Sequence, residues 1–157
     1  MQNPFTLTFG KSPLEPIERP LQTMEIVDTF TAETVNQQMF IITGVQGSGK
    51  TVMMTEIARR LREREDWVVI ELNPATDLLQ GMLAKLNSNK VCAAIIKSAK
   101  IDLSFFGFGV AIEGVPPLTD TETAIITILE KLKKQDKRLL ITIDEAVSYT
   151  HLTLPTT

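Results

Sequence analysis

The stretch Gly44-Val45-Gln46-Gly47-Ser48-Gly49-Lys50-Thr51 restricts the fold of this chain more than any other feature. It fits the pattern G-x-x-x-x-G-K-[ST] at every fixed position, and this pattern is typical of loops whose backbone N–H groups wrap a polyphosphate. Such a loop has to join a buried strand to a helix. The apolar run at 39–42 precedes it and a helical pattern follows it, so the sequence predicts a strand–loop–helix unit.

Each fixed position of this loop has a chemical reason. The glycines let the backbone approach the phosphates, Lys50 brings a positive charge to the β- and γ-phosphates, and Thr51 offers a hydroxyl to Mg²⁺. A glycine turn without a ligand is the alternative interpretation. The nucleotide contacts predicted from the pattern are Gly44, Gln46, Gly47, Ser48, Gly49, Lys50, Thr51 and Val52.

Composition narrows the class of protein. A chain of 157 residues with 43% hydrophobic residues and a net charge of −3 is typical of one soluble globular domain, and its bulk charge does not favour nucleic-acid binding. No segment is apolar over the length of a membrane span, and the first residues lack a signal-peptide pattern, so we expect a cytoplasmic protein. Since the chain has one cysteine and one histidine, it offers neither an internal disulfide nor a Cys/His zinc site. We expect Cys92 to be a buried, inert thiol.

Hydrophobic periodicity predicts the remaining elements. Residues 1–20 contain four prolines and form an arm, and Pro20 suits the first turn of a helix with an apolar stripe at Met24, Val27 and Phe30 or Thr31. Further helices are expected around 52–61, 78–86, 91–98 and 121–132, and a strand at 67–72. The expected buried positions are Val52, Met53, Ile57, Ala58 and Leu61 in the first of these helices, and Ala124, Ile125, Ile128, Leu129 and Leu132 in the last. We expect the arginine-rich end of the first to be a salt-bridged, solvated face, with a nucleic-acid patch as the alternative. We expect Ser88 to cap the 91–98 helix, and Thr119 and Glu122 to form a capping box. Residues 101–113 alternate with a period of two, which predicts a β-hairpin that turns near 106–107.

A second chemical motif lies near the end of the chain. Residues 139–145 read Leu-Leu-Ile-Thr-Ile-Asp-Glu, an apolar strand that ends in two carboxylates. At the carboxyl end of a parallel strand, Asp144 would hold Mg²⁺ through water beside Thr51. Glu145 would then polarise a water for attack on the γ-phosphate. The alternative is a polar strand end without a ligand.

The two motifs together resemble the Walker A and Walker B motifs of AAA-type ATPases, over about residues 1–145. The resemblance extends to the origin-recognition-like and STAND-like branches, because an arm and a short helix precede the first strand. It implies an α/β fold, a P-loop three-layer sandwich with a mostly parallel sheet, here incomplete and with the hairpin inserted. It also implies ATP and Mg²⁺ as cofactors, phosphate contacts from Gly47, Gly49 and Lys50, metal contacts from Thr51 and Asp144, and catalytic roles for Glu145 and Lys50.

Residues 146–157 are Thr-rich and contain the only Tyr and the only His of the chain. From Val147 onward they resemble a translated sequencing adapter, so we expect a non-native tail and a partial ATPase domain that ends at Glu145. A native strand-exit loop is the alternative. A chain that ends there would lack the strand, sensor residue and lid of its parent, and we expect it to be inactive.

The sequence therefore predicts ATP binding and Mg²⁺-dependent ATP hydrolysis in the full-length parent, with an unknown output. A nucleotide-dependent switch or scaffold with little turnover is the alternative, and a DNA-associated loader or remodeller is a third reading. The expected ligand is ATP or ADP, and a second copy of the chain or another protein is a further possible partner. The sequence gives no support for a nucleic-acid partner, and we expect no membrane association.

Overall fold

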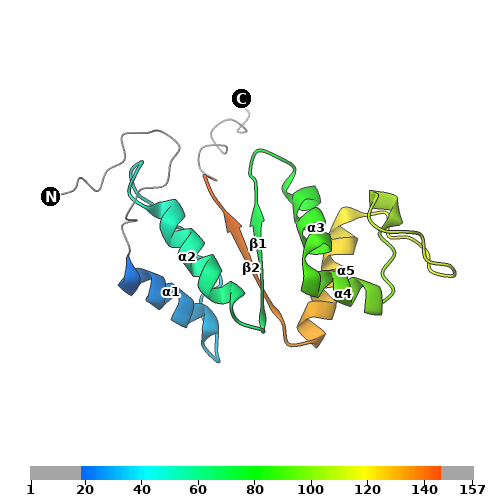
Figure 1. Cartoon of the computed structure of the whole chain (residues 1–157), viewed down its shortest axis with the longest axis horizontal. Coiled ribbons are helices and arrows are strands. Elements are labelled where there is room, and N and C mark those ends of the chain that lie inside the picture. Colours follow the sequence, from blue (N-terminus) through cyan, green and yellow to red (C-terminus); the bar gives the residue numbers. More distant parts are fainter. Residues whose placement is uncertain (1–18, 146–157) are drawn as a thin grey trace. The chain divides into compact units, whose positions relative to one another are not determined.

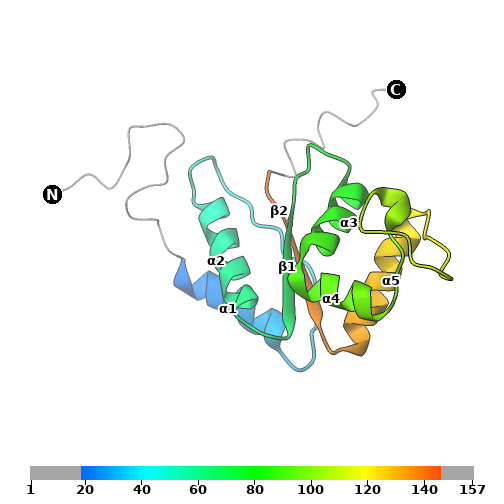
Figure 2. The same cartoon turned by 45° about the vertical axis from the view of Figure 1, so that its right-hand side comes forward.

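The computed structural model describes residues 19–145, in two compact units that divide between Arg60 and Leu61. The N-terminal arm up to residue 18 and the Thr-rich tail from 146 lie outside the described residues. Figure 1 labels the helices and strands, and Figure 2 gives a second view of the same elements. Each unit is described by itself.

The first unit contains α1 (Pro20–Thr31) and most of α2 (Lys50–Arg62). Pro20 stands at the start of α1, as predicted, because its missing N–H has no acceptor in the first turn. The predicted apolar stripe is wrong by about one residue: Thr23 and Ile26 are buried, whereas Met24 is 48% exposed. The Phe30 ring meets the Phe40 ring edge-on, with 5.1 Å between the ring centroids.

The strand predicted at 39–42 does not form in the described structure. This segment has no regular hydrogen-bonded structure, and Met39 and Ile41 are 71% and 73% exposed. A strand requires a neighbour that takes up its backbone N–H and C=O groups, and the first unit contains no other strand among its described residues. The prediction of a buried strand is therefore wrong for this segment.

α2 follows the prediction closely. Met53, Ile57, Ala58 and Leu61 are all buried. On its polar side, Glu56 accepts hydrogen bonds from Arg59 and Arg60 at 2.8 Å. These two guanidinium groups lower the pKa of Glu56 to about 2, so the arginine-rich end of α2 is a salt-bridged helix face, as expected.

The second unit is built on two parallel strands, β1 (Trp67–Leu72) and β2 (Arg138–Ile143). They pair in register from Trp67 opposite Arg138 to Leu72 opposite Ile143. Because the strands run in the same direction, both carboxyl ends meet at one edge of the sheet. Both strands were predicted. The three-layer sandwich stays a prediction, since the described residues form a two-stranded sheet only.

Three helices lie on one side of this strand pair in both views: α3 (Leu78–Ser88), α4 (Lys90–Ser98) and α5 (Thr121–Lys134) (Figures 1 and 2). Their apolar sides and the strands make a shared core. Its most completely buried members are Val68, Leu83, Leu86, Cys92, Ala124, Ile128 and Leu132. Burial raises the pKa of the Cys92 thiol to about 11, which fits the inert thiol that we predicted.

The caps of these helices differ from the predictions. Asn89, not Ser88, caps the N-terminus of α4, because its side-chain oxygen accepts from the N–H groups of Val91 and Cys92. Asp120, not Thr119, caps the N-terminus of α5 by accepting from the Thr123 N–H at 2.8 Å. Ser, Thr, Asp and Asn serve almost equally well as caps, so neighbouring candidates cannot be ranked by sequence alone.

The predicted hairpin at 101–113 is also wrong. The segment contains the short 3₁₀ helix η1 (Ser104–Phe106) and an irregular loop that projects from the helices (Figure 2). The Asp102 carboxylate, which is only 2% exposed, accepts from the N–H groups of Ser104 and Ile112 at 2.9 Å. The hydrogen bond from Ser104, with that from Ile112, lowers the pKa of Asp102. The Asp102 carboxylate thus accepts hydrogen bonds from two backbone N–H groups, where a hairpin would have hydrogen bonds between strands.

We predict that Leu86→Ala lowers the free energy of unfolding by about 2–5 kcal/mol, because it leaves a cavity where the side chain is fully buried. Urea denaturation measures this change, and the labelling rate of Cys92 by a thiol reagent reports the opening of the same core. Val91→Ala is the matched control. Since Val91 is 37% exposed, its loss should cost less than about 1 kcal/mol, and an equal effect of both variants would contradict this core.

Candidate functional site

The phosphate-loop pattern forms a compact turn in the first unit, at the start of α2. The Ser48 N–H donates to the Val45 carbonyl at 3.1 Å, and the first backbone bond of the helix runs from Met53 N–H to Gly49 O at 3.0 Å. The N–H groups of the first helical turn have no acceptor inside the helix. The loop therefore leads directly into a positive helix end, the arrangement that anion binding requires.

Two glycines of the loop stand where a side chain would interfere. Gly49 has φ = 83°, a left-handed conformation that other residues adopt at a cost. A Cβ atom on Gly44 would lie 2.6 Å from Ser48 Oγ, so the two ends of the loop approach each other closely. The pattern thus predicted correctly where the backbone needs glycine.

Lys50 folds back across this loop. Its Nζ donates to the carbonyls of Gly44 at 2.8 Å and Val45 at 2.9 Å. Ser48 Oγ is buried and has no hydrogen-bond partner among the described residues. A buried hydroxyl without a partner and an ammonium group that donates to backbone carbonyls are both suited to phosphate oxygens. The residues present therefore fit a nucleotide phosphate.

The residues predicted to contact the nucleotide lie in the loop and in the first turn of α2. Gly44 to Gly49 form the loop, and Lys50, Thr51 and Val52 form the first turn of α2. Gln46 and Gly47 are exposed at its turn, and Thr51 is exposed on the helix.

Sequence reasoning missed Arg19. Its guanidinium donates to the Ser48 carbonyl at 2.8 Å, across 29 residues of the chain. A lone arginine next to a proline carries no recognisable signal, so only the folded structure could associate it with the loop.

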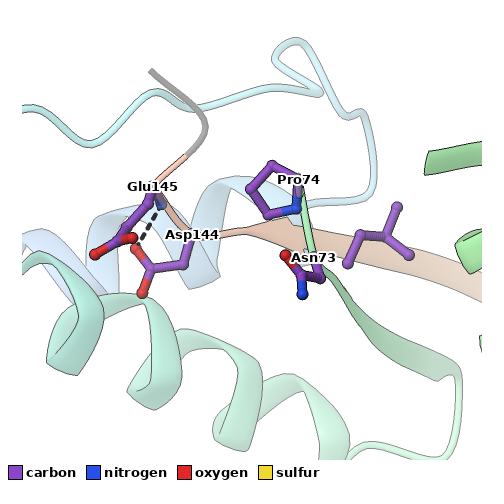
Figure 3. A pocket seen from close by; sticks show the side chains of 5 residues that line it. Asn73, Pro74, Asp144 and Glu145 are labelled. Atoms are coloured by element: carbon purple, nitrogen blue, oxygen red, sulfur yellow. Dashed lines mark hydrogen bonds between the residues drawn. The ribbon is translucent and has the colours of Figure 1, made fainter. Parts of the chain in front are cut away.

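The two carboxylates predicted near the end of the chain lie in the second unit. β2 ends at Ile143, and Asp144 and Glu145 follow it at the carboxyl edge of the strand pair. Together with Leu72, Asn73 and Pro74 from the end of β1, they line an open hollow of about 230 Å³ (Figure 3). The parallel register brings the two strand ends together, as we expected for Asp144.

Within this hollow, the two acidic residues contact each other through the backbone. The Glu145 N–H donates to Asp144 Oδ1 at 2.9 Å (Figure 3). Glu145 has φ = 55°, a conformation that is uncommon for a residue with a side chain and is often found at functional sites. Asn73, which was not predicted as a site residue, also lines this hollow. Its side-chain oxygen accepts a hydrogen bond from the Ala75 N–H, which fixes the orientation of the side chain. Over residues 19–145, no group of three or more His, Cys, Asp or Glu side chains could hold a metal ion.

Gly49→Ala is predicted to strain the loop by about 1 kcal/mol, because alanine disfavours a positive φ. We expect weaker binding of a fluorescent ATP analogue, measured by titration. Gly81→Ala is the matched control: Gly81 lies inside α3, and a Cβ there would approach nothing closer than 3.8 Å. It should stabilise the chain by about 0.4–1 kcal/mol in urea and leave binding unchanged. Equal binding by both variants would contradict the role of Gly49.

The comparison with protein families corrects the resemblance stated above. Residues 21–94 match the family described as mitochondrial ribosomal death-associated protein 3, and no AAA-type family matches. The matched stretch includes the phosphate loop and β1 but not Asp144 or Glu145. The strand–loop–helix pattern is common to many nucleotide-binding families, so it could not identify the family by itself.

Other comparisons add no relatives: no curated protein and no solved structure matches the chain. Within residues 19–145, no helix is long and apolar enough to cross a membrane. The cytoplasmic location stays a prediction. The matched family is P-loop NTPase-like, so over residues 21–94, just under half of its length, this chain is similar to a nucleotide-binding family.

Proposed function

We propose that this chain binds ATP together with Mg²⁺ through the loop Gly44–Thr51. The observation that carries the proposal is the arrangement of that loop: a glycine-permitted turn leads into the start of α2, and Lys50 donates to the Gly44 and Val45 carbonyls. The family match over residues 21–94 supports nucleotide binding.

Bound phosphate would replace the carbonyl contacts of Lys50. An ammonium group gains more from a phosphate oxygen than from a neutral carbonyl, because the former bond joins two opposite charges. The backbone N–H groups at the start of α2 would add further donors. Lys50 is therefore the residue on which phosphate binding should depend most.

The metal part of the proposal rests on the sequence motif that places Asp144 directly after β2. Mg²⁺ is commonly bound by one or two carboxylates, several waters and the phosphates of the substrate. Asp144 at a strand edge supplies one such carboxylate, and a larger protein cluster is not required. A volume of about 230 Å³ is below that of an ordinary small-molecule pocket, so we assign the hollow to a hydrated cation.

Lys50→Ala should weaken binding of a fluorescent ATP analogue at least about tenfold, because it removes the charge that faces the β- and γ-phosphates. Fluorescence titration of the 157-residue chain measures the effect. Lys134→Ala removes an equal charge from an exposed position in α5 and serves as the control. Equal affinities of Lys50→Ala and the unaltered chain would refute the proposed site.

Asp144→Asn should weaken binding of ATP in the presence of Mg²⁺ but not in EDTA, because it removes a negative charge that only the metal requires. Titrations under both conditions measure this difference. Glu145→Gln should leave both affinities unchanged if Glu145 serves to activate water. A loss for Asp144→Asn that is the same with and without Mg²⁺ would contradict a metal role.

Turnover is the finer part of the proposal. We assign to Glu145 the role of polarising water in a complete form of this protein, with Lys50 stabilising the transferred phosphate. The second candidate is a nucleotide-dependent switch or scaffold with little turnover, and the ribosomal name of the matched family favours it. A Glu145→Gln variant that hydrolyses ATP at the unaltered rate would count against a catalytic role for Glu145.

A further inference from the structure

Arg19 connects the beginning of the described chain to the phosphate loop. Its backbone carbonyl accepts from the Thr23 N–H at 3.0 Å, which places Arg19 at the start of α1. Its side chain donates to the Ser48 carbonyl at 2.8 Å, and this contact is partly buried. One residue therefore joins a helix start to the loop through its backbone and its side chain.

The contact has a consequence for the direction of an N–H group. Ser48 O and the Gly49 N–H belong to one peptide unit, and the described chain contains no cis peptide bond. In a trans peptide the C=O and N–H bonds point in opposite directions. A donor that holds the Ser48 carbonyl on one side therefore holds the Gly49 N–H toward the other side.

Lys50 acts similarly on the other arm of the loop, through the Gly44 and Val45 carbonyls. The two cations differ in what binding would require of them. Lys50 would have to leave its carbonyls to meet phosphate, whereas Arg19 can keep its contact with Ser48. Without Arg19, the Ser48–Gly49 peptide would be free to turn over, and a nucleotide would have to order it on binding.

We propose that Arg19 is a positioning residue for nucleotide binding, which orders the Ser48–Gly49 peptide before a phosphate arrives. The inference rests on the proposed function of the loop. It ties the start of α1 to the state of the phosphate loop. Arg19 acts on the loop backbone and not on one particular phosphate, so ATP and ADP should depend on it equally.

The test compares fluorescent ATP and ADP analogues on Arg19→Ala, Arg19→Lys and Arg64→Ala. Arg19→Ala should bind both nucleotides about tenfold more weakly, because a hydrogen bond from a charged donor is lost. Arg19→Lys keeps a donor and should recover part of the affinity. Arg64→Ala removes the same charge from a surface pair with Asp66 and should bind like the unaltered chain.

Hydrogen exchange of the nucleotide-free chain gives a second readout. Arg19→Ala should speed exchange in the peptide that covers residues 44–51 and leave the rate in α1 unchanged. Faster exchange in α1 alone would overturn the proposal, because Arg19 would then serve only as a helix anchor. So would unaltered nucleotide affinity, or a loss much larger for ATP than for ADP, which would indicate direct contact with the γ-phosphate.

The two proposals fail in different ways. If the unaltered chain and Lys50→Ala both show no nucleotide binding, the proposed function fails, whereas the exchange experiment still shows whether Arg19 orders the loop. If the unaltered chain binds and Lys50→Ala does not, an Arg19→Ala variant that binds normally refutes the role of Arg19 alone.

Discussion

The second unit depends on the parallel pairing of β1 with β2, which joins segments about seventy residues apart. This register places Leu72 opposite Ile143, so that Asn73, Pro74, Asp144 and Glu145 follow the strands at one edge. The helices α3, α4 and α5 bury their apolar sides in the core that this pairing supports. A shift of the register by one residue would turn each side chain of a strand to the opposite face and would disrupt both the core and the hollow.

In the first unit, the loop Gly44–Thr51 forms several hydrogen bonds between its own polar groups. Lys50 and Arg19 both donate to loop carbonyls, Lys50 from the start of α2 and Arg19 from the start of α1. These hydrogen bonds fix the orientation of the loop carbonyls and therefore of the N–H groups in the same peptide units. Two side-chain cations, Lys50 and Arg19, thus orient the backbone of the loop. This loop has the glycine positions and the helix start that its sequence pattern specifies. Arg19, which also contacts the loop, lies outside that pattern.

Much of the fold could be predicted because its signals are local. The buried positions of α2 and α5, and the bounds of β1, follow from hydrophobic periodicity. The errors arose where tertiary contacts decide. The alternating residues at 101–113 resemble a hairpin, but the buried Asp102 takes up the Ser104 and Ile112 N–H groups in place of a strand neighbour. The apolar run at 39–42 has strand composition, yet it remains irregular and exposed. Composition cannot show whether a partner strand is present.

By itself, the sequence determined the positions of the loop glycines and the order of most elements, because both depend on residues close together in the chain. It predicted Lys50, Gly49 and the acidic pair by pattern, but it assigned them to the wrong family, since that pattern is shared by many. Only the tertiary structure decided that Arg19 reaches Ser48 and that Asn73 faces the carboxylates. These contacts link residues 29 and about seventy positions apart, and such distances are closed by packing and hydrogen bonding in the folded chain.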